Sequence, residues 1–205
     1  MLPVYVLWLQ QMWINMNITN MNYHCVDIVD IIDKIRPGDI FAFSGNTLFS
    51  SLVKLVSNSN VSHVGIALSN SIMIESTMES NSHNIGVFEN TIITHLSNYD
   101  GSVWFLPLSD ETHNKLNKTN FFDFINSNEH KPYDLPGAIA AVLKLNSCKE
   151  DYSKFWCSEL DTAALIAGGI DLPMKPQFAL PIDLCRFDIF GNDYYQIHGT
   201  PTLIK

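Results

Sequence analysis

Cys157 has the type and setting of a reactive residue. It stands within DYSKFWCSELDTAALIAGGI (151–170), where apolar residues recur at helical spacing from the cysteine onward. Ser153 is a candidate N-cap and Gly168 with Gly169 is a stop signal, so we expect a helix to begin at or just before Cys157. A thiol in the first turn of a helix lies near unpaired backbone N–H groups and the positive end of the helix dipole, which favours the thiolate. Cys157 is therefore a candidate nucleophile, with a buried, inert cysteine as the structural alternative.

His63 and Glu75 are the candidates for a base and the group that orients it. VSHVGIAL (61–68) is typical of a strand, and its alternation places His63 and Gly65 on one face, where the glycine clears space. IMIEST (72–77) follows a short polar turn and should pair with it antiparallel. Glu75 is the one charged residue of that segment, and a carboxylate there is costly unless it is paired. Paired with His63, it would leave the second ring nitrogen free to take a proton from Cys157.

Each of these residues also has a structural interpretation. A lone histidine in an apolar strand is usually a satisfied core residue, and Glu75 would then be a solvated carboxylate at a strand edge. His198 is a second candidate for the base. The remaining histidines considered fall in polar or loop contexts and are predicted to lie at the surface: His83, His95, His113 and His130.

The elements that must position these residues alternate along the chain. We expect a helical segment over 25–35, an amphipathic helix over 47–56, a helix over 110–126, an apolar helix over 138–145, and strands over 40–43, 85–88, 103–106 and 194–197. These elements predict an α+β fold in which a small antiparallel sheet packs on helices, the Cys157 helix among them.

Length and charge narrow the classes of protein. The 205 residues suit one domain over 23–205, preceded by an apolar extension over 1–22. The net charge is −9 and the 12 basic residues are scattered, which argues against nucleic-acid binding. Four cysteines without a CxxC pair or a His/Cys cluster predict no metal and no cofactor, and favour a reducing, cytoplasmic compartment. The apolar run of the extension, residues 1–15, is too short to span a bilayer. A signal peptide is the less favoured interpretation of it, whereas a surface-docked helix, a partner-binding segment or a start codon assigned too far upstream of Met16 and Met21 stay equally open. Membrane association through it is the alternative to a cytoplasmic location.

Four short motifs occur in a characteristic order: HVGI with His63, IEST with Glu75, the turn KPYD with Tyr133, and WCSEL with Cys157. This order resembles the circularly permuted branch of the NlpC-type papain-like superfamily, the YiiX-like group, which has bacterial and poxvirus members and is related to lecithin:retinol acyltransferase-like enzymes. The resemblance covers roughly residues 35–190. In ordinary papain-like chains the cysteine helix precedes the histidine strand, whereas here the histidine comes first.

The resemblance implies a permuted papain-like fold and assigns roles to four residues. Cys157 would be the nucleophile, His63 the general base and acid, and Glu75 the residue that orients His63. Tyr133 would lie near the oxyanion or the substrate, with a turn tyrosine packing under the next helix as its structural alternative. Trp156, directly before the cysteine, departs from the pattern and could narrow the cleft.

The function that this implies is that of a cysteine peptidase or amidase, which cleaves an amide bond through a thioester. Two alternatives stay open: a lipid acyltransferase or phospholipase that uses the same thiolate, and a catalytically inactive binding module. The expected partner is a peptide-like or lipid-like small substrate, and the oligomeric state is left open.

Overall fold

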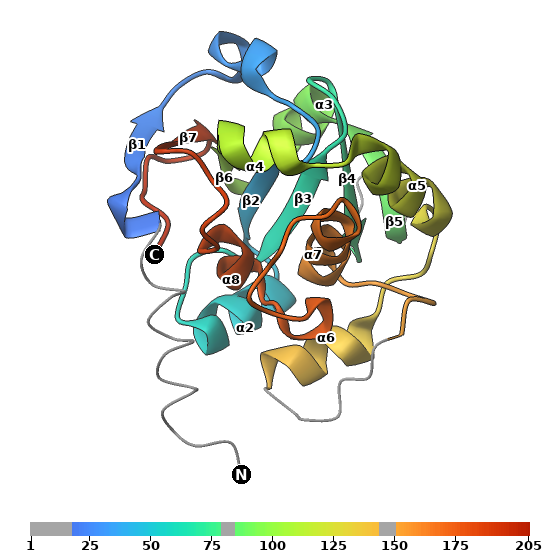
Figure 1. Ribbon diagram of the computed structural model, residues 1–205. Coiled ribbons are helices and arrows are strands. Elements are labelled where there is room, and N and C mark those ends of the chain that lie inside the picture. Colours follow the sequence, from blue (N-terminus) through green and yellow to red (C-terminus); the bar gives the residue numbers. More distant parts are fainter. Residues whose placement is uncertain (1–17, 79–84, 144–150) are drawn as a thin grey trace, which may run out of the picture.

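The computed structural model describes residues 18–78, 85–143 and 151–205. Its centre is a seven-stranded sheet with the order β1-β7-β6-β2-β3-β4-β5 (Figure 1). Neighbouring strands run antiparallel, except that β1 and β7 are parallel. The strands are β1 (Asn22–Cys25), β2 (Ile40–Gly45), β3 (His63–Ala67), β4 (Ile72–Thr77), β5 (Gly86–Thr91), β6 (Gly101–Leu106) and β7 (Asp193–His198).

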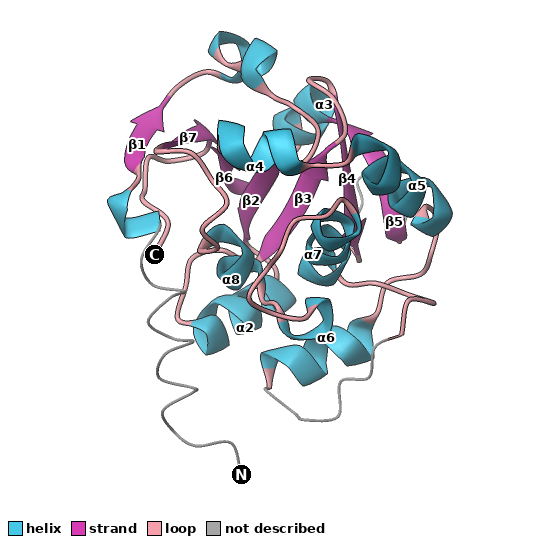
Figure 2. Ribbon diagram, in the orientation of Figure 1, coloured by secondary structure: helices cyan, strands magenta, loops and turns pink. Residues whose placement is uncertain are grey.

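Helices cover both faces of this sheet (Figure 2). The larger core lies between one face and most of the helices, whereas α3 and the segment 26–35 cover the other face. The helix α7 packs on β3 and β4, which brings its first turn to the hairpin that carries His63 and Glu75. The helices are α2 (Leu48–Ser57), α3 (Ile92–Ser97), α4 (Asp110–Lys115), α5 (Lys118–Asn128), α6 (Leu135–Val142), α7 (Cys157–Ala167) and α8 (Pro181–Cys185).

The α+β class is as predicted, but the sheet is mixed and not purely antiparallel. The strand β1 was not predicted, because its residues NYHC are mostly exposed and show no apolar alternation. The helix α3 was not predicted either. The segment 25–35 forms two short 3-10 turns, Ile28–Asp30 and Ile32–Lys34, in place of one helical segment.

The predicted helix over 110–126 is two helices. Asn117 accepts a hydrogen bond from the backbone N–H of Asn120 and so caps a new helix, α5, directly after α4 ends. The helix α6 begins earlier than expected, because Asp134 accepts a hydrogen bond from the N–H of Gly137 at 2.9 Å. Residues 144 and 145 of the predicted helix lie outside the described residues.

The described part of the chain contains no helix long and apolar enough to cross a membrane. Of the predicted N-terminal extension, residues 1–17 are outside the described ranges. Ile18 and Met21, which follow them, are buried in the larger core.

The hairpin of β3 and β4 agrees with the prediction from alternation. Its register pairs Ile66 with Ile74 and Ala67 with Met73. Gly65 clears space on the face that carries Glu75: a Cβ atom added there would lie 2.5 Å from Met73 Cε and 3.3 Å from Glu75 Cβ. The glycine therefore lets β4 place Glu75 close to β3.

We expect Gly65→Ala to destabilise the protein by about 1–3 kcal/mol, since the added methyl group overpacks the hairpin and displaces Met73 and Glu75. Denaturant unfolding measures this change. Gly191→Ala is the matched control, because a Cβ there meets only Pro107 O at 3.9 Å. Equal stabilities of the two variants would contradict the steric role of Gly65.

Candidate active site

The helix α7 begins at Cys157, as the sequence predicts, but Trp156 and not Ser153 is its N-cap residue. The Ser153 N–H donates to Asp151 Oδ1 at 3.0 Å, outside the helix. Glu159, in the third helical position, accepts a hydrogen bond from the Trp156 N–H and holds the helix start. Ser158 donates to Ala179 O at 2.5 Å. These contacts fix the first turn, which carries the thiol.

Trp156 does not narrow the cleft. Its side chain is 2% exposed, packs in the larger core and does not line the cavity at Cys157. The buried Trp156 side chain thus holds the start of α7 against the core.

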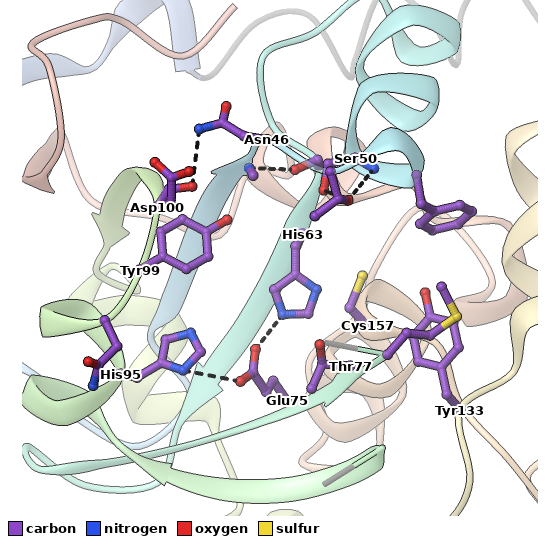
Figure 3. Close-up of a pocket in the computed structure, with 16 residues that line it drawn as sticks. Asn46, Ser50, His63, Glu75, Thr77, His95, Tyr99, Asp100, Tyr133 and Cys157 are labelled. Atoms are coloured by element: carbon purple, nitrogen blue, oxygen red, sulfur yellow. Dashed lines mark hydrogen bonds and ion pairs between the residues drawn. The ribbon is translucent and has the colours of Figure 1, made fainter. Parts of the chain in front are cut away.

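His63 and Glu75 are in contact across the hairpin (Figure 3). His63 Nε2 lies 2.5 Å from Glu75 Oε2, and the Glu75 side chain is 2% exposed. The second ring nitrogen, Nδ1, is on the side of the imidazole that faces the Cys157 sulfur (Figure 3). All three side chains line one cavity of about 340 Å³. The structure therefore brings together Cys157, His63 and Glu75.

The electrostatics of these residues favour the imidazolium. Burial alone would lower the pKa of His63, but Coulombic attraction and hydrogen bonding to Cys157 and Glu75 outweigh it and raise that pKa well above its usual value. Burial also works against the charged form of Glu75, yet the hydrogen bond and charge of His63 hold the pKa of Glu75 below its usual value. The arrangement suits a negative sulfur, a positive ring and a negative carboxylate in line.

Tyr133 lines the same cavity, on the other side of the Cys157 sulfur from His63 (Figure 3). Its backbone forms a parallel bridge with Phe155, two residues before the cysteine. Phe155 N donates to Pro132 O at 3.1 Å, and Asp134 N donates to Phe155 O at 2.9 Å. The KPYD turn is thereby fixed to the start of α7, and Tyr133 lies at the wall of the cavity beside Cys157.

Two neighbours of Glu75 were missed from the sequence. Asn90 Nδ2 in β5 donates to Glu75 Oε1 at 2.8 Å, and His95 Nδ1 in α3 lies 3.5 Å from the same oxygen. His95 was predicted at the surface, but its side chain is only 16% exposed and its ring lies against Phe43. A signal was present, since His95 lies next to Leu96 and three residues after Ile92 on the apolar face of a short helix. Asn90 gives no comparable signal.

The other histidines lie elsewhere. His198, the second candidate base, does not line the Cys157 cavity; its Nε2 donates to Tyr99 O at 3.0 Å. His130 is exposed as predicted, whereas His113 is partly buried. His83 is outside the described residues.

Two further acids are buried on α7. Asp161 is one turn after Cys157, and neither of its carboxyl oxygens has a hydrogen-bond partner in the described part of the chain. Burial raises the pKa of Asp161 well above its usual value, with a smaller contribution from the charge of Cys157. Burial thus favours the neutral form of Asp161 one turn from the sulfur. Burial also raises the pKa of Glu159, to about 8.

Glu159 should make stability depend on pH. Its pKa is higher in the folded chain than in the unfolded one, so between about pH 4.5 and pH 8 the unfolded chain is the one that loses the proton, and stability falls as pH rises through this window. Glu159→Gln can still accept a hydrogen bond from the Trp156 N–H. We expect this substitution to reduce the loss of unfolding free energy across the window by on the order of 3 kcal/mol. Denaturant unfolding across this range measures it, with exposed Glu89→Gln as the control. A slope unchanged from that of the native sequence would show that Glu159 is ionised when folded.

Within residues 18–78, 85–143 and 151–205, no group of three or more His, Cys, Asp and Glu side chains is placed to hold a metal ion. Fold and site together define an α+β protein with a cysteine, a histidine and a glutamate converging in one cavity.

Comparison with known proteins finds similarity among solved structures. No family model and no curated protein matches the sequence. Among solved structures, the chain is similar to the crystal structure of the metalloprotein YiiX from Escherichia coli O157:H7, DUF1105, with 17% sequence identity and a TM-score of 0.47. The aligned part covers 66% of this chain and 68% of YiiX. The similarity is one of fold, and nothing about activity follows from it.

Proposed function

We propose that this protein is a thiol-dependent hydrolase of the permuted NlpC-type papain-like class, which cleaves amide bonds. The observation that carries the proposal is the position of the His63 ring, with Nε2 on buried Glu75 and Nδ1 toward the sulfur at the start of α7. Nucleophile, base and orienting group in this order are the elements of a catalytic triad.

The reaction follows from these positions. The Cys157 sulfur attacks the carbonyl carbon, and His63 gives its proton to the leaving amine as the C–N bond breaks. A thioester is left on Cys157. His63 then takes a proton from water, the resulting hydroxide adds to the thioester carbonyl, and the C–S bond breaks to release the acid.

In each tetrahedral intermediate the former carbonyl oxygen carries negative charge, and hydrogen-bond donors are needed to stabilise it. The backbone N–H of Cys157 belongs to the first turn of α7, where N–H groups have no partner within the helix. The Tyr133 hydroxyl, on the other side of the sulfur from His63, is the second donor that we assign (Figure 3).

Selective alkylation tests the proposal. A fluorescent iodoacetamide probe at mildly acidic pH should label Cys157 ahead of the other cysteines, because the thiolate is the reacting form. Peptide mapping separates the sites: Cys25 is exposed and serves as the internal reference, and Cys185 is buried. Labelling of Cys157 no faster than that of Cys25 would favour the inactive binding module.

A second candidate, a lipid acyltransferase or phospholipase, is favoured by an apolar surface beside the cavity. The packed helices α2 and α6 expose apolar side chains at helical spacing, and Phe49 and Tyr133, adjacent to this surface, line the cavity. Lys54 is the one charged residue of the two helices, and it donates to Gly45 O at 2.7 Å. The surface consists of Leu48, Leu52, Leu55, Leu135, Ile139 and Leu143.

Flotation with phosphatidylcholine vesicles tests this candidate. If the surface docks on lipid, Leu48→Glu with Leu55→Glu should abolish flotation, since these side chains are 93% and 78% exposed and would enter the bilayer. Val29→Glu, at an exposed site on another part of the molecule, is the control. No flotation of the unmodified protein would remove the support for the lipid alternative and leave the amidase proposal intact.

A further inference from the structure

A second hollow, of about 420 Å³, adjoins the Cys157 cavity. Asn46, Tyr99 and Asp100 line both, and they lie on the side of His63 away from Tyr133 (Figure 3). The lining of this hollow is almost wholly polar, unlike the side of the cavity near Phe49 and α2. We call it the Asp100 hollow; its side chains include Ser44, Asn46, Asp100, Ser102, His198 and Thr200.

Apart from histidines, the charged side chains that line this hollow and the Cys157 cavity are carboxylates, and the Lys54 ammonium lies next to the cavity, 2.7 Å from Gly45 O. Neither the hollow nor the Cys157 cavity is lined by a lysine or an arginine, and their carboxylates are those of Glu75 and Asp100. Glu75 is neutralised by His63, whereas Asp100 forms no ion pair within the described ranges. The chain as a whole carries a net charge of −9. A positively charged group is therefore attracted to the hollow, and an anion is repelled.

The residues that form the hollow are held in place. Asn46 donates from its amide to Asp100 O at 3.3 Å, and His198 donates to Tyr99 O at 3.0 Å. The Tyr99 ring packs on Phe43, with ring centroids 5.1 Å apart. These contacts connect β2, β7 and the loop before β6, so the carboxylate and the aromatic ring lie beside the route to His63. A carboxylate next to an aromatic ring is suited to binding an ammonium group.

We propose that the Asp100 hollow binds an organic ammonium group of the substrate, so that the site selects substrates with positive charge near the scissile carbonyl. This rests on the proposed function, since it takes Cys157 as the reacting group. The ammonium group could belong to a peptide, as a primary amine, or to a lipid headgroup, as a quaternary amine. Both share the chemistry that Asp100 and Tyr99 recognise.

Three methanethiosulfonates of similar size test the proposal on the full chain: a cationic trimethylammonium-ethyl reagent, a neutral one and an anionic sulfonatoethyl one. Each transfers its thioalkyl group to the Cys157 sulfur, with a new S–S bond formed and methanesulfinate released. We divide the rate at which each reagent modifies Cys157 by its rate with a small free thiol. The resulting relative rates should fall from the cationic reagent to the neutral one to the anionic one.

Asp100→Asn should lower the rate of the cationic reagent about threefold to tenfold and leave the rate of the neutral reagent unchanged. The effect is modest because this carboxylate is exposed. Asp123→Asn, at an exposed site on α5, is the matched control.

The outcomes separate this proposal from the function on which it rests. Fast modification of Cys157 by the neutral reagent, with no cationic preference or with equal loss in the Asp123→Asn control, overturns the Asp100 hollow and leaves the nucleophile standing. Slow modification by all three reagents overturns the proposed function.

A protection experiment identifies the source of the ammonium group. Choline represents the quaternary amine and glycinamide the primary amine, and each is tested for protection of Cys157 against the neutral reagent, with glycerol as the uncharged control. Protection by either ammonium compound supports the proposal, and protection equal to that by glycerol contradicts it.

Discussion

Cys157→Ala is expected to lower the rate of hydrolysis at this site by at least about 10³-fold, because the covalent route through the thioester is lost and binding alone remains. Turnover of an activated ester such as p-nitrophenyl acetate, with the burst that an accumulating acyl-enzyme gives, measures the effect without knowledge of the natural substrate. The burst should disappear together with the steady-state rate.

Cys25→Ala is the matched control for this prediction, since that thiol is exposed and outside the Cys157 cavity. It should leave both burst and turnover unchanged. Hydrolysis that survives in Cys157→Ala and is lost in Cys25→Ala would move the reaction to another part of the molecule. The proposed triad would then be wrong.

Glu75→Gln is expected to lower turnover by about 10²–10⁴-fold with little change in the fold. Glu75 accepts from His63 Nε2 on one oxygen and from Asn90 Nδ2 on the other. An amide cannot accept on both sides, so in either orientation the NH₂ group of the introduced amide faces another donor. If it faces His63, the ring proton moves to Nδ1, the nitrogen that must take a proton from Cys157.

The same substitution should change the pH dependence of alkylation at Cys157. Cys157 and Glu75 both raise the pKa of His63, so loss of the carboxylate lowers that pKa and moves the loss of the imidazolium to lower pH. Comparison of the pH profiles of Glu75→Gln and of Glu89→Gln, an exposed glutamate of β5, detects the shift. Coincident profiles would mean that Glu75 has a structural role only, whatever happens to turnover.

Local patterns in the sequence were sufficient for the parts of the site that depend on one element or one turn. The helix that starts at Cys157 follows from apolar residues at a spacing of three and four and from the two glycines at its end. The contact of His63 with Glu75 follows from strand alternation across a short turn, together with the cost of a buried carboxylate without a partner. Such patterns show which face of an element is buried.

Only the tertiary structure decided which distant elements meet. Asn90 and His95 reach Glu75 because β5 pairs with β4 and α3 follows β5 back over the sheet. The parallel pairing of β1 with β7 joins residues near the two ends of the chain, and the Asp100 hollow needs β2, β6 and β7 to lie side by side. The periodicity of apolar residues shows which face of a helix or strand is buried. It does not show which other element packs on that face, since many apolar surfaces would fit equally well. That choice depends on packing the whole chain at once, which is why Asn90 and His95 were missed as neighbours of Glu75, whereas local patterns were enough to single out Cys157, His63 and Glu75 as candidates.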